Sequence, residues 1–508
     1  MSKKPEVVNL SKEEAERLQT ALSASNLEEG DKDIITKIII GYCWIKNMLQ
    51  EARISLHRLK GFFGFSGKTT EKKTRLSPKK NTEDKKKPKG HGRTPLKKYW
   101  GAKVVNTNHE HLKAGDLCEE CGGRLHAIKP KTTLALKGHS LVSAEKHVLE
   151  SLKCWKCDKV YTAKAPRKYD SSVAAAVATG RYYNGFPNYR IQEMQKAVGV
   201  PLPDATQWDL IKGMEPAIRP IFEEMVELAS QGEVMHSDDT SVKILDVAAS
   251  NKTKGEKERT GMYTTGIISK VQNFIIALFI SGIQHAGENM KDLLVGRMST
   301  LIRMSDALSR NVKGANEVYQ IIVYCIAHAR RKFYEIYEYF PEACEWVLKR
   351  IALIYKHDYE ARDMSPDKRM KYHKKHSGPI IEEMKGWMEK QLEDKTVEPN
   401  SSLGKAMLYM LKRWKNFTRF LDVPGCPLDN NIVERALKIP IRARKNSLFY
   451  KTEFGAEMGS MITSIIHTCV LAKKSPMDYL TTLLNNEGAV IRNPKAWLPW
   501  NYEQHKAA

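Results

Sequence analysis

The sequence predicts an α/β fold built on a mixed β-sheet, with further helices inserted into it and added at both ends. Three strand-like runs follow one another at residues 234–245, 262–268 and 273–280, and a helix expected over 288–295 leads to a fourth at 301–306. Strands joined by short turns pair antiparallel, whereas a helical crossover returns the chain parallel. This order of strands is that of a ribonuclease-H-like domain.

Three acidic residues fall where such a domain can bring them together. Asp238 lies in the first strand, Asp306 ends the fourth, and Glu434 lies in a helix that Asp429 and its asparagine neighbours can begin. Hard divalent ions such as Mg²⁺ prefer oxygen ligands, and two of them can activate an attacking hydroxyl and stabilise the leaving oxygen of a phosphoryl transfer. The trio therefore predicts a catalytic magnesium site.

The helix that carries Glu434 is expected to stop before Pro440, because proline has no N–H to donate and clashes with the preceding turn. The simpler alternative for Glu434 is a surface ion pair with Lys438 at i, i+4, which stabilises a helix by only ~0.2–0.5 kcal/mol. The two distant aspartates favour the catalytic interpretation.

Several spaced motifs appear in a recognisable order. They are Asp238-Asp239-Thr240; Asp306; Cys325-x-x-His328-x-Arg330-Arg331-x-Phe333; Asp429-Asn430-Asn431 followed by Glu434-Arg435 and Arg444-Lys445-Asn446; and a tail with Ser464 to Thr468 and Leu498-Pro499-Trp500. Over nearly its whole length the chain resembles the insertion-sequence-66 family of transposases. The family signature is Asp-Glu-Thr, so Asp239 replaces a glutamate and is a candidate competitor for metal.

The resemblance implies a DDE transposase, which cuts double-stranded DNA at element ends and joins the freed 3′-hydroxyl to target DNA. Asp238, Asp306 and Glu434 would hold Mg²⁺ or Mn²⁺. The basic set expected at DNA is His328, placed by the scissile bond, with Arg330, Arg331, Arg435, Arg444 and Lys445. Two alternatives stay open: a structure-specific nuclease with the same acids but no joining step, and a retired transposase acting as a zinc-containing DNA-binding protein.

The charge of the chain also points to a polyanionic partner. The 508 residues carry a formal net charge of +24. Residues 68–98 hold thirteen Lys or Arg against three acids, among them Lys85, Lys86, Lys87 and Lys89. Two aliphatic residues in this stretch cannot form a core, so we expect a flexible arm that binds phosphates. A solvated linker is the alternative.

Four of the nine cysteines have the spacing of a metal site. Cys118-x-x-Cys121 and Cys154-x-x-Cys157 are two knuckles that suit a closed, tetrahedral structural Zn²⁺ site. Free thiols are the alternative. The remaining cysteines lack such pairing and are expected to be small buried residues: Cys43, Cys325, Cys344, Cys426 and Cys469.

The remaining segments read mainly as helices. Apolar residues from Ile38 to Leu59 alternate four and three apart, as in a coiled coil, although a helix packed on the body gives the same pattern. Residues 189–198 and 205–214, separated by Gly199, resemble a helix-turn-helix reader or alternatively support the sheet. Residues 366–377 are expected to be a basic interruption with little helix.

The predicted organisation follows from these segments. It comprises an N-terminal leucine-zipper-like helical region (1–66), a basic arm (67–110), a zinc element (111–165), a helical segment (166–230), the catalytic domain (231–455) with a helical insertion (334–424), and a C-terminal helical piece (456–508).

Partners and location follow from what the sequence lacks and from the resemblance. No run of eighteen apolar residues and no apolar leader are present, so we expect no membrane partner and a cytoplasmic, nucleoid-associated protein. Transposition needs two element ends held together, which favours a homo-oligomer. The family resemblance adds small accessory proteins as candidate partners.

Overall fold

The computed structural model describes residues 12–62, 115–117, 124, 141–145, 147–153, 160–162, 164, 166–251, 260–308, 311 and 319–505. The chain divides into two compact units, one made of Met1–Ser66 with Leu141–Ala508 and the other of Gly67–Ser140. In the smaller unit, the described residues include an isolated antiparallel bridge between Leu117 and Arg124. All elements below belong to the larger unit.

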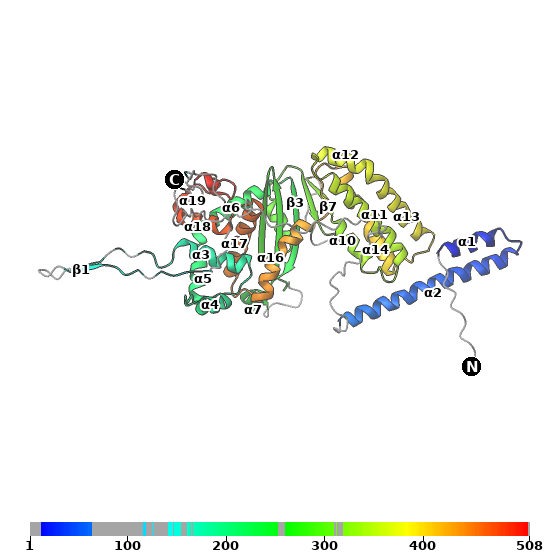
Figure 1. Ribbon diagram of the computed structural model, residues 1–508. Helices are drawn as coiled ribbons and strands as arrows, with labels where there is room; N and C mark the ends of the chain where they lie inside the picture. The colour runs from blue at the N-terminus through cyan, green and yellow to red at the C-terminus, as the bar shows by residue number, and fades with distance from the viewer. Residues whose placement is uncertain are drawn as a thin grey trace. The chain divides into compact units, whose positions relative to one another are not determined.

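A mixed five-stranded sheet forms the centre of the larger unit (Figure 1). Its strands are β3 (Val234–Ser241), β4 (Tyr263–Val271), β5 (Phe274–Gly282), β6 (Leu301–Ser305) and β7 (Gln320–Tyr324), in the order β5-β4-β3-β6-β7. The first three pair antiparallel, while β6 lies parallel to β3 and β7 parallel to β6. Helix α8 (Ala286–Leu293) lies between β5 and β6 in the chain. The four predicted strands and their directions are confirmed, and β7 was not predicted.

The two faces of the sheet are covered by different helices. One face packs on a large core with α3 (Ser171–Ala178), α5 (Asp204–Lys212), α6 (Glu215–Ser230), α18 (Pro476–Asn485) and α19 (Glu487–Arg492). On the other face, α16 (Asn431–Ser447) packs through Val433, Ala436 and Leu437 on Ile268 and Phe279. Met235 faces the large core. Because side chains alternate along a strand, His236 and Asp238 project from the other face, which α16 covers.

Helix α17 (Glu453–Leu471) covers the outer edge of the sheet. Its buried hydroxyls at Ser460, Ser464 and Thr468 accept hydrogen bonds from the backbone N–H groups of Ser281, Phe279 and Ala277 on β5, at 3.2, 2.8 and 3.0 Å. These are alternate residues of an edge strand, whose N–H groups would otherwise lack partners. By length and composition alone α17 could cross a membrane, but most of it is buried in this core.

The segment between β7 and α16 is a helical subdomain with its own core. Its helices are α10 (Ile326–Tyr334), α11 (Pro341–Glu360), α12 (Pro366–His376), α13 (Gly378–Glu393), α14 (Ser402–Leu411) and the short α15 (Trp414–Phe417). The expected interruption at 366–377 is wrong. Pro366 begins α12, where its missing N–H costs nothing, and buried His373 holds the helix through Nε2 to Asp358 at 3.0 Å.

The N-terminal helices are α1 (Lys12–Ser23) and α2 (Glu29–Phe62). Near its end α2 contacts the helical subdomain, since Ile54 is buried in that core and Glu51 Oε2 accepts from Ser402 Oγ at 2.8 Å. Earlier in the same helix, the predicted seam residues Ile38 and Ile45 are 63% and 56% exposed. The predicted coiled coil stays a prediction.

Shorter elements surround this framework. A short π-helix at Thr179–Tyr183 follows α3. Helix α4 (Asn188–Ala197) precedes α5, and helix α7 (Leu245–Ser250) follows β3. Gly199 turns the chain after α4 with φ +76°, so two short helices separated by a glycine are present as predicted. The strands β1 (Ser151–Lys153) and β2 (Val160–Thr162) pair antiparallel.

Candidate functional site

Asp238 lies on β3, and Asp306 directly follows the neighbouring parallel strand β6. The register pairs Val234 with Ile302 and His236 with Met304. Asp238 comes two residues after His236 and Asp306 two residues after Met304, and the charge of Asp306 raises the pKa of Asp238. Adjacent strands lie ~4.8 Å apart, and residues in matching positions project from the same face. The structure therefore brings together two of the three predicted acids.

The third acid arrives on α16, which crosses this face beside β3 (Figure 1). A close approach is possible because Gly266 stands opposite Asp238 on β4. A Cβ atom at Gly266 would lie 2.9 Å from Leu437 Cδ2 and 3.2 Å from Val433 Cγ2. Glycine thus lets α16 lie closely on the sheet, with Glu434 next to Val433 on the helix.

The three carboxylates interact electrostatically. The pKa of Asp238 is raised from 3.8 to about 7, mainly by burial and in addition by the negative charges of Asp306 and Glu434. Asp306 is 9% exposed, and its Oδ1 accepts from the amide of Asn311 and from the backbone N–H of Leu308. Such a set of crowded carboxylates fits a divalent cation, which would relieve their repulsion.

The expected end of α16 before Pro440 is wrong, because the helix continues to Ser447. An interior proline costs a helix ~3 kcal/mol. Burial of Val433, Ala436, Leu437 and Ile439 on the sheet side offsets this cost. Beyond the proline, Arg444 also holds the helix to the end of β3, donating to Ser241 Oγ at 2.6 Å and to Thr240 Oγ1 at 3.2 Å.

Asn430 joins three segments at the start of α16. It is fully buried, its Nδ2 donates to Ser237 O at 3.0 Å, and its Oδ1 lies 3.1 Å from His236 Nδ1. Its backbone N–H donates to Cys325 Sγ at 3.2 Å. Because burial lowers the pKa of His236 to about 4, this imidazole is neutral and must carry its proton on Nδ1 to reach the amide oxygen. The sequence indicated Asn430 as a helix start and gave no sign of this second role.

Asp239, the candidate competitor for metal, faces the opposite side of β3. Its Oδ1 accepts from Thr265 Oγ1 at 2.6 Å, and its Oδ2 accepts from the backbone N–H of Ala286 at 2.9 Å, in the first turn of α8. The side chain is 2% exposed. Asp239 therefore has a complete set of protein partners away from Asp238.

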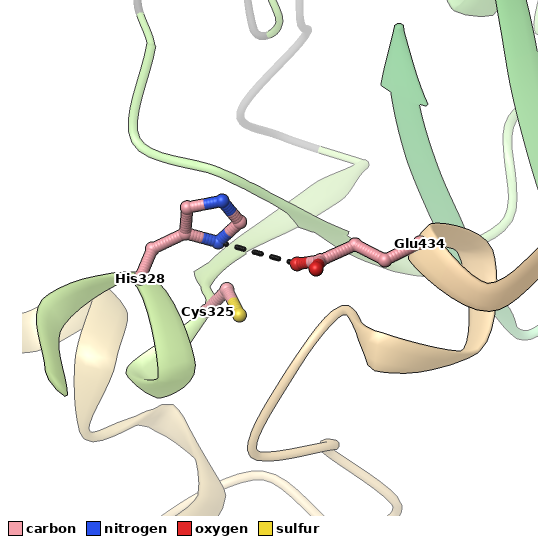
Figure 2. A group of neighbouring side chains, drawn as sticks. All are labelled: Cys325, His328 and Glu434. Atoms are coloured by element: carbon pink, nitrogen blue, oxygen red, sulfur yellow. Dashed lines mark ion pairs between the residues drawn. The ribbon is translucent and has the colours of Figure 1, made fainter. Parts of the chain in front are cut away.

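Cys325, His328 and Glu434 form a second cluster at the site (Figure 2). Cys325 precedes α10 and His328 lies in its first turn, while Glu434 comes from α16. His328 Nδ1 is 3.5 Å from Glu434 Oε1, and Arg331 Nη2 is 3.9 Å from Oε2. Glu434 thus faces α10. Among the described residues, no ion pair joins Glu434 to Lys438. The simple surface-pair interpretation of Glu434 is not supported.

Four cations lie on the solvent side of α16. Arg435, Lys438, Arg442 and Lys445 are exposed and spaced three, four and three residues apart, which sets them in one row on the helix. We call this set the α16 cation row. Lys438 and Arg442 were not among the predicted DNA contacts, although their helical spacing from Arg435 could have revealed them. Arg444, which was predicted, points to β3 instead. The side chain of Arg330 lies over the Tyr334 ring.

A polar cavity of about 190 Å³ adjoins the start of α16. It is lined by Arg435 and Asp429 from this region, His236 from β3, and Asp358 and Arg369 from the helical subdomain. The subdomain therefore contributes charged side chains next to the start of α16, a contact that the sequence did not predict.

Other predicted site residues lie outside the described part of the chain. These are the arm lysines Lys85, Lys86, Lys87 and Lys89 and the knuckle cysteines Cys118, Cys121, Cys154 and Cys157. The arm and the zinc site stay predictions. Four other cysteines are buried and free, as predicted: Cys325, Cys344, Cys426 and Cys469.

The model of the family described as "Transposase IS66 family" matches residues 167–458, more than half of the chain. The matched range contains the whole sheet, the helical subdomain and α16. The chain belongs to the IS66 family of transposases. It is therefore a transposase, an enzyme class that acts on DNA.

Relatives of this IS66-family transposase occur in Sinorhizobium fredii (strain NBRC 101917 / NGR234). Uncharacterized protein y4jD is 24% identical over 406 residues, which cover 76% of this chain and 78% of the relative. Uncharacterized protein y4hP is 24% identical over 447 residues, which cover 82% and 78%. The similarity therefore extends well beyond the residues of the family model, although the names of these relatives state no activity.

Proposed function

We propose that this transposase cuts DNA at the ends of its element and joins the freed 3′-hydroxyl to target DNA, with Mg²⁺ or Mn²⁺ as cofactor. The observation that carries the proposal is the placement of Asp238 on β3 and of Asp306 just after the parallel strand β6, with Glu434 on the helix that crosses them. The order β5-β4-β3-β6-β7, with its antiparallel and parallel pairs, supports a ribonuclease-H-like fold.

The donor set fits a hard divalent cation. Asp238, Asp306 and Glu434 offer only oxygen, and the pKa of Asp238 is raised first by burial and then by the charges of the neighbouring acids. When bound, such ions supply activation of an attacking hydroxyl and stabilisation of the leaving oxygen. The protein's own part is to hold the acids on two rigid strands and one packed helix.

Beside these acids the protein has a basic surface that suits DNA. The α16 cation row rises along the helix at intervals of roughly 5 Å, and successive phosphates of one DNA strand advance by about 3.4 Å along the duplex axis. The row can therefore contact several phosphates of one strand next to Glu434, which lies at the edge of the row and interacts electrostatically with Asp238. We assign phosphate contacts to Arg435, Lys438 and Lys445, and to Arg442 through the part of its guanidinium that does not donate to the backbone oxygen of Tyr183.

The test is the single replacement of Asp238, Asp306 or Glu434 by alanine. Each variant should lose Mg²⁺-dependent cleavage and joining, by about a thousandfold or more, while its affinity for DNA stays nearly unchanged. Cleavage and joining are measured on a labelled element end incubated with target DNA, and affinity by fluorescence anisotropy.

Asp239→Asn is the matched control, because it removes a neighbouring charge on the other face of β3. It should lower thermal stability and keep cleavage. An inactive Asp239→Asn with an active Asp238→Ala would show that the first acid is misassigned. Cleavage without joining in the unmodified protein would instead indicate a structure-specific nuclease.

A further inference from the structure

We propose that Cys325, His328 and Glu434 form a binding site for Zn²⁺, and that zinc bound there inhibits the enzyme by withdrawing Glu434 from Asp238 and Asp306. The inhibition rests on the proposed role of Glu434 as a magnesium ligand, whereas the binding of zinc does not. The site is separate from the predicted four-cysteine element.

The geometry of the cluster is that of a metal site. One ligand atom from each residue, Sγ, Nδ1 and a carboxylate oxygen, lies within 4.8 Å of the other two. His328 Nδ1 and Glu434 Oε1 are 3.5 Å apart, too far for a good hydrogen bond. Two ligands bound to one ion at ~2.0–2.1 Å in a tetrahedral arrangement lie roughly 3.4 Å apart. The observed separation therefore suits a shared ion.

The same two atoms also lack other partners. Among the described side chains, His328 Nδ1 and Glu434 Oε1 are buried without a hydrogen bond. Arg331 lies nearest to the other carboxylate oxygen, Oε2, at 3.9 Å, so it can stay in place when Oε1 binds metal. Buried polar atoms are costly without a partner, and an ion between these two would satisfy both.

The ligand types select zinc over magnesium. A thiol and an imidazole are ligands for Zn²⁺, whereas Mg²⁺ prefers oxygen and keeps most of its water. Cys325 enters as a thiolate and releases its proton to solvent. Three protein ligands leave the fourth position of a tetrahedral ion to water. Glu434 thus lies between an oxygen site formed with the two aspartates and a softer site formed with α10.

Cobalt binding tests the site without any need for catalysis. Co²⁺ is added to the full-length protein, and the thiolate-to-cobalt charge-transfer absorption is compared in the unmodified chain, Cys325→Ser and Cys344→Ser. Cys344 is the matched control, since it is also a buried, free cysteine and lies in α11. The four knuckle cysteines are common to all three proteins, so their absorption cancels in difference spectra.

Cys325→Ser should lose one thiolate–cobalt band and should bind cobalt at this site at least about tenfold more weakly. Cys344→Ser should keep the band and the affinity of the unmodified chain. Serine is close in size to cysteine and its oxygen can still accept from the Asn430 N–H, so the local fold should survive. An unchanged band in Cys325→Ser overturns the site. This result is independent of whether the protein cuts DNA.

Inhibition is tested separately by titrating Zn²⁺ into cleavage reactions that contain saturating Mg²⁺. Each protein is compared with its own zinc-free rate. The unmodified chain and Cys344→Ser should be inhibited at zinc concentrations that leave Cys325→Ser at least about tenfold less affected. Equal inhibition of all three proteins overturns the regulatory part of the proposal. If none of them cuts DNA with Mg²⁺, the proposed function fails while the cobalt result still stands.

Discussion

Asp238 titrates near neutrality in the metal-free fold. Its pKa is about 7 where an ordinary aspartate has 3.8, first because of burial and then because of Asp306 and Glu434. A carboxyl group whose pKa is raised by folding stabilises the fold fully below pH ~4, and this contribution is lost as the pH rises towards 7. The metal-free enzyme should therefore lose stability across that window.

Asp238→Asn should remove this loss, because an amide does not ionise. In the absence of divalent ions, the melting temperature of the variant relative to the unmodified protein should rise between pH 4.5 and 7.5, by an amount equivalent to ~1–2 kcal/mol after allowance for solvent screening. Differential scanning fluorimetry across this range measures it. A difference that is constant with pH would mean that Asp238 does not titrate there.

Single residues also show how far sequence patterns reach. Asp238 and Asp306 could be placed on strands because alternation and spacing are local signals. The family signature favoured Asp238 over Asp239, but only the observed partners of Asp239, Thr265 and Ala286, show that it points away from the site. The meeting of Cys325 with Glu434 joins segments far apart in the chain, and no local pattern encodes it.

At the scale of elements, the contact between α16 and β4 decides where Glu434 lies. Gly266→Ala would set a methyl group 2.9 Å from Leu437 Cδ2 and push the helix away from the sheet. We expect a loss of ~1–3 kcal/mol in the free energy of unfolding and a fall in cleavage rate of about tenfold or more. Chemical denaturation and the cleavage assay measure the two effects.

Gly282→Ala is the control, because a Cβ atom at this β5 position meets nothing within 4 Å. It should change neither quantity appreciably. Shortening the opposing side chain, in Gly266→Ala combined with Leu437→Ala, should restore part of the lost activity. A Gly266→Ala variant as active as the Gly282→Ala variant would show that α16 tolerates displacement.

Helix boundaries were harder to predict than strands. Pro440 was expected to end α16 and the basic run after Pro366 was expected to break the helical pattern, and both expectations are wrong. In each case tertiary contacts outweigh a local preference. α16 gains the burial of four apolar side chains on its sheet side, and α12 is held by the buried contact of His373 with Asp358.

At the scale of the whole molecule, positive charge is divided between the α16 cation row and the arm predicted from the sequence at residues 68–98. The arm has too few apolar residues to form a core, so its contribution to DNA binding should not depend on base sequence. Replacing Lys85, Lys86, Lys87 and Lys89 by glutamine should weaken all duplexes alike. The slope of log affinity against log salt concentration should flatten by up to ~3–4, about 0.9 for each phosphate contact.

Salt titrations on element-end DNA and on random DNA give this measurement. Discrimination between the two DNAs should survive in the arm variant, because base readout requires a folded element in a groove. Replacing Lys438 and Lys445 on α16 by glutamine provides the comparison from a folded surface. Lost discrimination with an unchanged salt slope would show that the arm reads bases.

The hydroxyl groups of α17 that cover β5 have a consequence for synthesis of the protein. Ser464 lies 185 residues after Phe279 and accepts a hydrogen bond from the backbone N–H of that residue. At about 5–20 residues per second, a ribosome needs roughly 10–40 s to make the intervening chain. During that time the newly made edge strand has no α17 to cover it, and Glu434 is also still absent for most of the delay. A nascent chain is thus open to wrong strand pairing before it can be an active enzyme, so chaperone supply and translation speed should influence its yield.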